Sequence, residues 1–371
     1  MQYRKFGKLD WKVSALGFGG FRFPVKEGNM YSAKIDEEET IRMLRYAFDH
    51  GVNYIDTGYP YHQGKSEEII GEVLQDGYRE KVMIATKLPF SGIDTLEQCD
   101  RIFNTQLKRL QTDYIDFYLL HALEPGSLRN SWTRVLDLGI MDWMEQQVAD
   151  GRVGYLGFSY HGTYEGFQKV IDDYDNWTVC MILYNYVDEH YQAGRRGLEY
   201  ATNKGLAVAI MEPLRGGALT KPIPPSIEKL WDSAEQKRTQ ADWALQWVWN
   251  HPQVSVVASG MSSLEQVKQN VASANQLGPG TLTNKELMLI SKVRDKYREL
   301  ATIRCSNCQY CMPCPNGLNI PLIFDFYNGT IMFNDLRGGQ QRYNGWLEEF
   351  EKTSSCTKCG ECLKKYLKFF R

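Results

Sequence analysis

Short apolar runs alternate with longer amphipathic segments over about the first 300 residues of the chain. Eight of these runs are expected to form β-strands, because each is six to ten residues long and rich in Val, Ile, Tyr or Phe. They lie at residues 13–19, 53–58, 81–88, 114–123, 153–160, 179–186, 206–214 and 254–261. The intervals between them leave room for a helix after each strand.

The intervening segments carry apolar residues at helical spacing. Residues 37–51, EEETIRMLRYAFDHG, show this spacing and end in a glycine, the residue that commonly follows a helix. Residues 241–250 and 263–276 have the same pattern. Eight strand–helix pairs within roughly 250 residues predict a closed parallel (β/α)8 barrel of the TIM type. A doubly wound sheet would instead carry a Gly-rich phosphate loop at its first turn, and GFGGFRFP at 17–24 does not fit that motif. We therefore expect a barrel over residues 1–298.

The composition is that of a globular protein, with 43% hydrophobic residues, 24% charged residues and a formal net charge of −2. A charge so close to zero gives no general electrostatic argument for nucleic acid or an anionic membrane as a partner. No apolar run approaches the roughly 20 residues that span a bilayer. The first residues, MQYRKFGKLDWKVSALGFGG, lack the basic-then-apolar pattern of a signal peptide. We expect a soluble, cytoplasmic protein.

Reactive side chains lie at the ends of three consecutive predicted strands. Asp56 and Lys87 end the second and third strands, Tyr61 follows Asp56 by five residues, and His121 lies near the end of the fourth. Active sites of such barrels lie at the carboxyl ends of the strands. A lone His or Lys is usually structural or solvated, whereas four reactive side chains at one barrel mouth indicate a catalytic site.

These four residue types suit proton transfer to a carbonyl oxygen. A phenol has a pKa near 10 and is a reluctant acid at neutral pH. We expect the Lys87 ammonium to stabilise the phenolate and lower the pKa of Tyr61, while Asp56 holds that ammonium in place. Tyr61 would then act as general acid while a hydride reaches the carbonyl carbon. His121 would hydrogen-bond the same oxygen.

The blocks NYIDTGYPYHQGKSE, ATKLP and LLH around these residues resemble the signature of the aldo-keto reductase superfamily. The resemblance covers residues 1–298. It implies a TIM barrel that reduces aldehydes and ketones, or oxidises the alcohols, with NAD(P)(H) as cofactor. It also implies a catalytic tetrad, which falls here on Asp56, Tyr61, Lys87 and His121.

The resemblance implies cofactor contacts too, with some departures from the family pattern. Ser159 would hold the nicotinamide carboxamide, although a tyrosine replaces the asparagine that commonly follows it. Met211 stands where an aromatic ring commonly stacks on the nicotinamide. The basic pair that reads the 2′-phosphate of NADPH falls on neutral Gly260 and Gln266, so we expect NAD(P) without choosing between the two forms. The implied contacts are Ser159, Asn185, Met211, Pro213, Leu214, Arg215 as a substitute cation, Gly260, Gln266, and Asn270 for the adenine.

Seven of the nine cysteines lie after residue 304, in two runs with three-residue spacing. In a chain without a signal peptide, this spacing favours a metal site over disulfides. Cys99 and Cys180 lie apart from these runs and are expected to be small buried side chains. The first run is Cys305, Cys308, Cys311 and Cys314, followed by Pro315, and the second is Cys356, Cys359 and Cys362.

Bacterial ferredoxin-type sites combine a cysteine triplet with a remote Cys-Pro cysteine. This rule supplies Cys314 as the fourth ligand of Cys356, Cys359 and Cys362, which predicts one complete 4Fe–4S cluster. The triplet Cys305, Cys308 and Cys311 could hold a second cluster, but Tyr366 stands where its fourth cysteine is expected. A structural zinc site is the alternative, although triplets with a Cys-Pro fit iron–sulfur better. The tail, residues 299–371, resembles the dicluster ferredoxin domain fused to some bacterial aldo-keto reductases.

Two functions agree with these features. In the first, the barrel is a reductase of a small carbonyl substrate, and the tail supports the fold or exchanges electrons with a redox protein partner. In the second, a catalytically weak barrel is a redox- or nucleotide-sensing module. A hydride carries two electrons and an iron–sulfur cluster carries one, so we favour a cluster that lies beside an independent hydride reaction.

Overall fold

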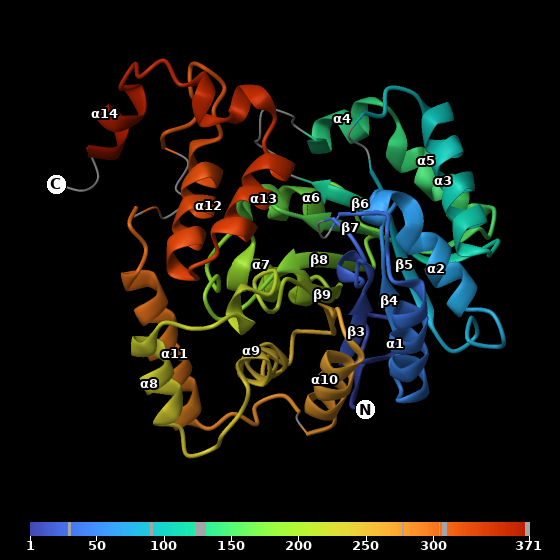
Figure 1. Cartoon of the computed structure of the whole chain (residues 1–371). Coiled ribbons are helices and arrows are strands. Elements are labelled where there is room, and N and C mark those ends of the chain that lie inside the picture. The colour runs from blue at the N-terminus through green and yellow to red at the C-terminus, as the bar shows by residue number, and fades with distance from the viewer. Residues whose placement is uncertain are drawn as a thin grey trace. The chain divides into compact units, whose positions relative to one another are not determined.

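A closed barrel of eight parallel strands forms the first part of the protein, in the order β10-β3-β4-β5-β6-β7-β8-β9 (Figure 1). The computed structural model describes residues 1–28, 31–89, 92–123, 131–276, 278–303, 305 and 310–367, with the side chains of 366 and 367 excepted. The strands are β3 (Leu16–Gly19), β4 (Tyr54–Asp56), β5 (Met83–Leu88), β6 (Ile115–Leu123), β7 (Val153–Tyr160), β8 (Val179–Leu183), β9 (Ala207–Met211) and β10 (Val256–Gly260). The prediction of a TIM-type barrel is confirmed.

The first predicted strand is two strands in the structure. Its first residues belong to β2 (Lys12–Ser14), which pairs antiparallel with β1 (Tyr3–Lys5), and the barrel strand begins only at Leu16. Phe6 and Val13 of this hairpin pack into the core cluster of the barrel. The hairpin therefore gives the N-terminal segment its own apolar contacts, and both strands read as one apolar run in the sequence.

Large and small side chains share the interior of the barrel. Tyr54 and Phe117 fill it from β4 and β6, while Ala85 and Ala209 leave space for their rings. Strands covered on both faces read as almost continuous apolar runs, which is why all eight are visible in the sequence.

Helices follow the strands as expected. The predicted helix at 37–51 is α1 (Glu37–Asp49): the Asp36 carboxylate accepts from the Glu39 N–H at 3.3 Å, and Gly51 follows with φ 92°. The predicted helices at 241–250 and 263–276 are α9 (Gln240–Trp249) and α10 (Leu264–Gln276). The others of this part are α2 (Lys65–Val73), α3 (Leu96–Leu110), α4 (Ser131–Asp137), α5 (Ile140–Ala149), α6 (Tyr164–Asp172) and α7 (Gly194–Asn203).

Packing divides the chain into two units. The first contains Met1–Arg215 and Thr239–Thr283, and the second contains Gly216–Arg238 and Asn284–Arg371. This division differs from the boundary expected at residue 298, because α8 (Pro225–Asp232) lies in the second unit together with α11 (Asn284–Glu299). Lys285 and Glu235 form an ion pair at 2.9 Å between these two segments.

The regular elements described in the second unit are helical. Besides α8 and α11, they are α12 (Ile320–Met332), α13 (Leu336–Trp346), α14 (Glu361–Leu367) and short 3-10 turns. An apolar cluster of Leu318, Ile320, Ile323, Phe326 and Leu347 forms its core. Across both units, none of the helices in the described ranges is long and apolar enough to cross a membrane.

Candidate active site

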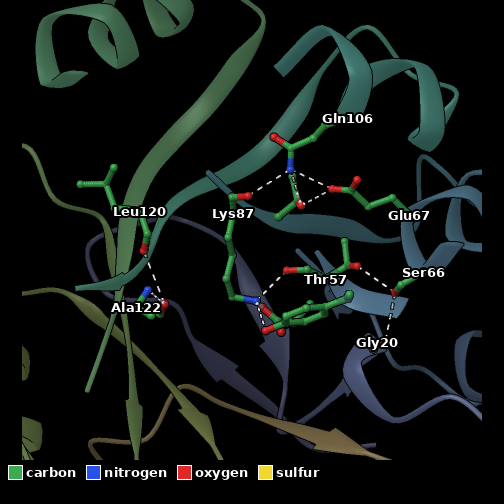
Figure 2. A network of polar contacts seen from close by, with 12 residues as sticks. Gly20, Thr57, Ser66, Glu67, Lys87, Gln106, Leu120 and Ala122 are labelled. Carbon is green, nitrogen blue, oxygen red and sulfur yellow. Dashed lines mark hydrogen bonds and ion pairs between the residues drawn. The ribbon is translucent and has the colours of Figure 1, made fainter. Parts of the chain in front are cut away.

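Asp56, Tyr61 and Lys87 meet at the carboxyl ends of β4 and β5. Lys87 is only 1% exposed. Its Nζ lies 2.7 Å from Asp56 Oδ1, 2.6 Å from the Thr57 carbonyl oxygen and 3.1 Å from the Tyr61 hydroxyl oxygen. An ammonium group has three protons, so these contacts match its full donor capacity. Figure 2 shows the extended Lys87 side chain reaching the backbone at Thr57.

Two rings hold the Tyr61 side chain from different sides. Phe21 lies 4.8 Å from it between ring centroids, and the His121 imidazole lies 5.7 Å away in an edge-on arrangement. His121 projects from β6, the neighbour of β5 in the barrel. The structure therefore brings all four residues of the predicted tetrad together, as the strand-end rule led us to expect.

The turn that follows Tyr61 carries backbone strain. His62 and Gln63 have φ values of 50° and 58°, a left-handed conformation that costs on the order of 1 kcal/mol or more for a residue with a side chain. His62 is buried, its Nδ1 lies 2.8 Å from the Ser32 carbonyl oxygen, and its ring stacks on Phe23. These contacts stabilise the strained turn and hence the direction in which Tyr61 points.

The pKa of Tyr61 differs from the expectation drawn from sequence. Burial raises it above the ordinary value, and the positive charge of Lys87 acts in the opposite direction without overcoming burial. The predicted effect of Lys87 is present, but the pKa as a whole is raised, because the removal of a phenolate from water outweighs one nearby cation here. The pKa of Lys87 is raised despite its burial, since the Asp56 carboxylate and the Tyr61 hydroxyl oxygen, which both accept hydrogen bonds from Nζ, favour the ammonium. At neutral pH the site holds a protonated phenol beside a cation.

His121 is neutral in this environment. Burial, followed by the charges of Lys87 and His161, lowers the pKa of His121 to about 3. A neutral imidazole carries one N–H donor and one nitrogen acceptor. His121 can therefore donate a hydrogen bond to a substrate oxygen without contributing a positive charge.

Comparison with known proteins decides the family. Residues 15–279 match the Aldo/keto reductase family. The chain belongs to this family. It is similar to L-galactose dehydrogenase of Arabidopsis thaliana, with 27% identity over 326 residues that cover 81% of this chain and 96% of the relative.

Two solved aldo-keto reductases share the fold. One from Bacillus halodurans, in its holo form, has a TM-score of 0.63 and 28% identity. One from Klebsiella pneumoniae, in complex with NADPH, has a TM-score of 0.61 and 25% identity. Each match covers 79% of this chain and 96% of the solved chain. The protein is thus an NAD(P)-dependent oxidoreductase of the aldo-keto reductase family.

Two of the expected cofactor residues are bonded within the reductase itself. Asn185 is buried: its Nδ2 donates to Asp188 Oδ2 at 3.0 Å and to the Glu212 carbonyl oxygen at 3.2 Å, while its Oδ1 accepts the N–H groups of Val187 and Asp188. Arg215 Nε donates to the same Asp188 oxygen at 2.9 Å. These bonds join the loops that follow β8 and β9.

Ser159 contacts the strand that carries His121. Its Oγ accepts the Ala122 N–H at 2.7 Å and donates to the Leu120 carbonyl oxygen at 3.4 Å. Ala122 has φ 57°, and the pairing of β6 with β7 shifts register between Leu120 and Leu123. Ser159 therefore shapes the irregular end of β6, a role that the sequence did not predict.

Other expected cofactor contacts lie at the end of β10. Gly260 ends this strand, and a Cβ there would approach the Arg22 side chain to 3.0 Å, so Arg22 packs over the glycine. Gln266 Oε1 accepts the Ser262 N–H at 2.8 Å, and Ser262 Oγ donates to the Arg22 carbonyl oxygen at 2.9 Å. The Arg22 side chain and backbone therefore lie close to the turn that leads from β10 into α10.

The remaining cofactor residues of the prediction lie nearby in the barrel. Asn270 of α10 is buried and its Nδ2 donates to Ser259 Oγ at 3.3 Å. Met211 is the last residue of β9, and Pro213 and Leu214 follow it in the loop that leads to Arg215.

A second imidazole was missed by the sequence reasoning. His161 directly follows β7, and its backbone N–H donates to the Leu123 carbonyl oxygen at 3.0 Å, beside the end of β6. Burial is the largest cause that lowers the pKa of His161 to about 4, and the positive charge of Lys87 lowers it further, so this imidazole is neutral at neutral pH as well. The signal was present in GFSYHG, where a histidine follows a strand at the barrel mouth.

The cysteines that could hold a metal lie in the second unit. Cys311, Cys314 and Cys362 pack against the apolar cluster around Leu318. Asn316 Nδ2 donates to Thr357 Oγ1 at 2.9 Å, which ties the Cys-Pro turn to the second cysteine run. The end of the first run at Cys314 therefore lies close to the start of the second run. Cys99 and Cys180 are buried in the first unit, as predicted for cysteines outside these runs.

The cysteine side chains do not come together around a common point in the part of the chain that the structure describes. Within these ranges no three His, Cys, Asp or Glu side chains are grouped so that they could hold a metal ion. Cys305, Cys356 and Cys359 are exposed. Cys308 and the side chain of Tyr366 lie outside the described residues.

Proposed function

We propose that this protein reduces an aldehyde or ketone with NAD(P)H, or oxidises the corresponding alcohol, with Tyr61 as the general acid. The observation that carries the proposal is the 3.1 Å contact between Lys87 Nζ and the Tyr61 hydroxyl. It places a fixed cation at the oxygen that becomes negative when Tyr61 gives up its proton.

The chain's own residues account for the proton transfer. NAD(P)H, when bound, supplies the hydride. The Tyr61 hydroxyl gives its proton to the carbonyl oxygen, and the neutral His121 donates a hydrogen bond to that oxygen. Lys87 Nζ stabilises the resulting phenolate, and Asp56 keeps Lys87 oriented and charged. Burial of this group excludes water, which strengthens each of these interactions.

The cofactor would lie across the strand ends that carry the predicted contacts. Ser159 would approach the carboxamide, and Met211 would pack against the nicotinamide ring. Asn185 of the loop after β8 and Pro213, Leu214 and Arg215 of the loop after β9 would contact the cofactor together, since Asn185 and Arg215 are both bonded to Asp188. Gly260, Gln266 and Asn270 would contact the adenine nucleotide, with Arg22 as a further cation beside its phosphates.

The test is Tyr61→Phe, with turnover measured on a broad panel of aldehydes and sugars. This variant is expected to lose carbonyl-dependent NAD(P)H oxidation and to keep cofactor binding, measured by quenching of protein fluorescence. Turnover by Tyr61→Phe at the rate of the unchanged protein would disprove the role of Tyr61. Absence of turnover by the unchanged protein across the panel would favour the sensing module, which relatives named as dehydrogenase and reductase do not favour.

We further propose that Cys314, Cys356, Cys359 and Cys362 hold one 4Fe–4S cluster. Support comes from the packing of Cys314 and Cys362 on one apolar cluster and from the bond between Asn316 and Thr357. The Lys358 N–H donates to Cys356 Sγ at 3.4 Å, a contact that stabilises a thiolate. Such a cluster would supply structural support or a one-electron carrier for a redox protein partner.

Anaerobic purification with iron and sulfide analysis tests the cluster. The protein is expected to be brown, and Cys314→Ser is expected to lose the iron and sulfide that Cys99→Ser retains. A colourless protein that contains zinc would overturn the proposal. A second cluster on Cys305, Cys308 and Cys311 would appear as additional iron that survives in Cys314→Ser.

A further inference from the structure

A buried carboxylate lies behind the strand that carries Lys87. Glu67, on α2, is 0% exposed. Its Oε1 accepts from Thr86 Oγ1 at 2.7 Å and from Gln106 Nε2 at 2.8 Å, and its Oε2 accepts from Arg109 at 3.2 Å. Figure 2 shows Glu67 and Gln106 facing each other beside the Lys87 backbone. Burying a carboxylate is unfavourable by several kcal/mol unless it is paired and bonded, and here both oxygens are bonded.

One side of this network holds the backbone of Lys87. Gln106 Nε2 lies 3.1 Å from the Lys87 carbonyl oxygen, in addition to its contact with Glu67. The Tyr118 hydroxyl donates to Gln106 Oε1 at 2.8 Å, which fixes the orientation of the amide. Thr86, the residue before Lys87, is bonded directly to Glu67. The base of the Lys87 side chain is therefore fixed by groups that belong to α2, α3 and β6.

The other side of the network holds the turn that carries Tyr61. Arg109 donates to the Tyr59 carbonyl oxygen at 3.2 Å, and its guanidinium lies 4.6 Å from the centre of the Tyr59 ring. Gly64 has φ 95°, and a Cβ there would lie 2.4 Å from the central guanidinium carbon. Arg109 thus contacts the chain on both sides of Tyr61 and needs a glycine to do so.

Ser66, the neighbour of Glu67 on α2, contacts residues that surround the Lys87 side chain. Ser66 Oγ donates to the Gly20 carbonyl oxygen at 2.9 Å and lies 2.9 Å from Thr57 Oγ1 (Figure 2). The Thr57 carbonyl oxygen accepts from Lys87 Nζ. The first turn of α2 therefore reaches both ends of the Lys87 side chain.

We propose that Glu67 is a positioning residue for the Tyr61–Lys87 pair. Its carboxylate joins the Lys87 backbone, through Thr86 and Gln106, to the Tyr61 turn, through Arg109, and so sets the distance between the ammonium and the phenol. A neutral glutamine could keep the contacts to Thr86 or Gln106, but only a carboxylate pairs with the Arg109 charge as well. The inference rests on the proposed function, because its kinetic consequence presupposes that Tyr61 is the proton donor.

The chain offers a matched control for a merely structural effect. Asp116, on β6, is also a buried carboxylate: its Oδ2 accepts the Ile84 N–H at 2.8 Å and pairs with Arg79 at 2.9 Å. It contacts the same strand as Glu67 does, but near the beginning of β5 and away from Lys87. Asp116→Asn should therefore destabilise the protein without moving the tetrad.

The experiment compares Glu67→Gln, Thr86→Val, Thr86→Ser and Asp116→Asn in the full-length protein. Thermal unfolding, cofactor affinity, kcat and KM are measured for each variant. Glu67→Gln and Thr86→Val are expected to lower kcat by about 10- to 100-fold, because small misplacements of reacting groups cost that much. Cofactor affinity should be unchanged, Thr86→Ser should keep its turnover, and Asp116→Asn should lose stability but not kcat.

A second readout avoids turnover altogether. In protein labelled with ¹³C at the tyrosine Cζ, the Tyr61 resonance is identified by its absence from Tyr61→Phe. It should shift in Glu67→Gln and Thr86→Val and stay in place in Thr86→Ser and Asp116→Asn. If Glu67→Gln does not fold, the Thr86→Val and Thr86→Ser pair decides.

Two results would overturn the inference: unchanged kcat and resonance in Glu67→Gln and Thr86→Val, or an equal loss of kcat in Asp116→Asn. Full activity of Tyr61→Phe would instead overturn the proposed function, and the resonance would still show whether Glu67 positions Tyr61.

Discussion

Replacing Lys87 with methionine is the sharpest perturbation of the proposed chemistry. Methionine has a similar length and no charge, so Lys87→Met removes the ammonium while filling most of the same space. The variant loses the cation at the Tyr61 hydroxyl and leaves Asp56 buried without its partner. We expect the rate of carbonyl reduction to fall because the phenolate is no longer stabilised.

The size of the expected loss in kcat follows from the distance between Lys87 Nζ and the Tyr61 hydroxyl oxygen. At 3.1 Å and an effective dielectric constant of about 20, one positive charge stabilises a phenolate by about 5 kcal/mol, or about 4 pKa units. When about half of the proton transfer is complete in the transition state, about half of this energy enters the barrier. The expected loss in kcat is then about 100-fold.

The assay must separate lost chemistry from lost stability. Breaking a buried ion pair by removing one partner destabilises a protein by about 3 to 5 kcal/mol, so Lys87→Met is expected to unfold at lower temperature. The double variant Asp56→Asn with Lys87→Met restores neutrality and should recover much of that stability. Turnover is followed by the loss of NAD(P)H absorbance at saturating aldehyde, below the unfolding temperature of each variant.

The two variants together can refute the reasoning. If the double variant recovers both stability and turnover, the loss in Lys87→Met came from unfolding and not from the missing cation. If Lys87→Met itself turns over like the unchanged protein, the ammonium does not stabilise the phenolate. Recovery of stability without recovery of kcat is the result that we expect.

Three further predictions concern other parts of the barrel. The pKa values of His121 and His161, about 3 and about 4 in the fold, lie below their ordinary value of 6.5. The unfolded chain therefore binds more protons at these two residues than the folded protein does. The free energy of unfolding that they contribute is fully present above about pH 6.5 and is lost as pH falls, by about 1 to 2 kcal/mol for each imidazole near pH 5. Urea unfolding across this range should show a weaker pH dependence in His161→Gln, and an equal dependence would contradict the assignment. Glu39 Oε1 accepts the Leu264 N–H at 3.0 Å, so its negative charge lies at the start of α10, where the 2′-phosphate of NADPH would lie. Glu39→Gln removes this charge and should improve kcat/KM for NADPH over NADH by about fivefold. No change in this ratio would place the 2′-phosphate elsewhere. Ser159→Ala leaves the Ala122 N–H without its acceptor. We expect this variant to lower the free energy of unfolding by about 1 to 3 kcal/mol and to reduce kcat. A change in cofactor affinity alone would mean that Ser159 contacts the carboxamide but does not position β6.

The barrel could be predicted from the sequence because its strands are covered on both faces. Such strands appear as continuous apolar runs, and the run at 153–160 matches β7 (Val153–Tyr160) at both ends. Other bounds were too wide: residues 179–186 contain β8, which ends at Leu183. Tyr184 and Tyr186 are buried outside the strand, and apolar composition cannot separate a buried loop from a buried strand.

The four tetrad residues were predictable for a different reason. A closed parallel barrel brings the carboxyl ends of all its strands to one mouth, so positions that are far apart in sequence converge by topology alone. The net pKa of Tyr61 could not be predicted in this way, because it depends on how far burial outweighs Lys87. The same holds for Arg22 over Gly260 and for Arg109 against Gly64, where an arginine side chain packs on the backbone of a separate segment.

In the cysteine-rich tail, the sequence could not predict how the ligands are arranged in space. Spacing identifies ligand types and suggests a pairing, but the runs lie in turns and short helices, where no topology rule brings remote residues together. Cys311, Cys314 and Cys362 pack on one apolar cluster, so residues of both runs come close together there. The exposed Cys356 and Cys359 are not brought to them by the described part of the chain. Because thiolates must be deprotonated to bind metal and metal binding is coupled to folding, the cluster that we propose would bring these four cysteines together only when it is bound.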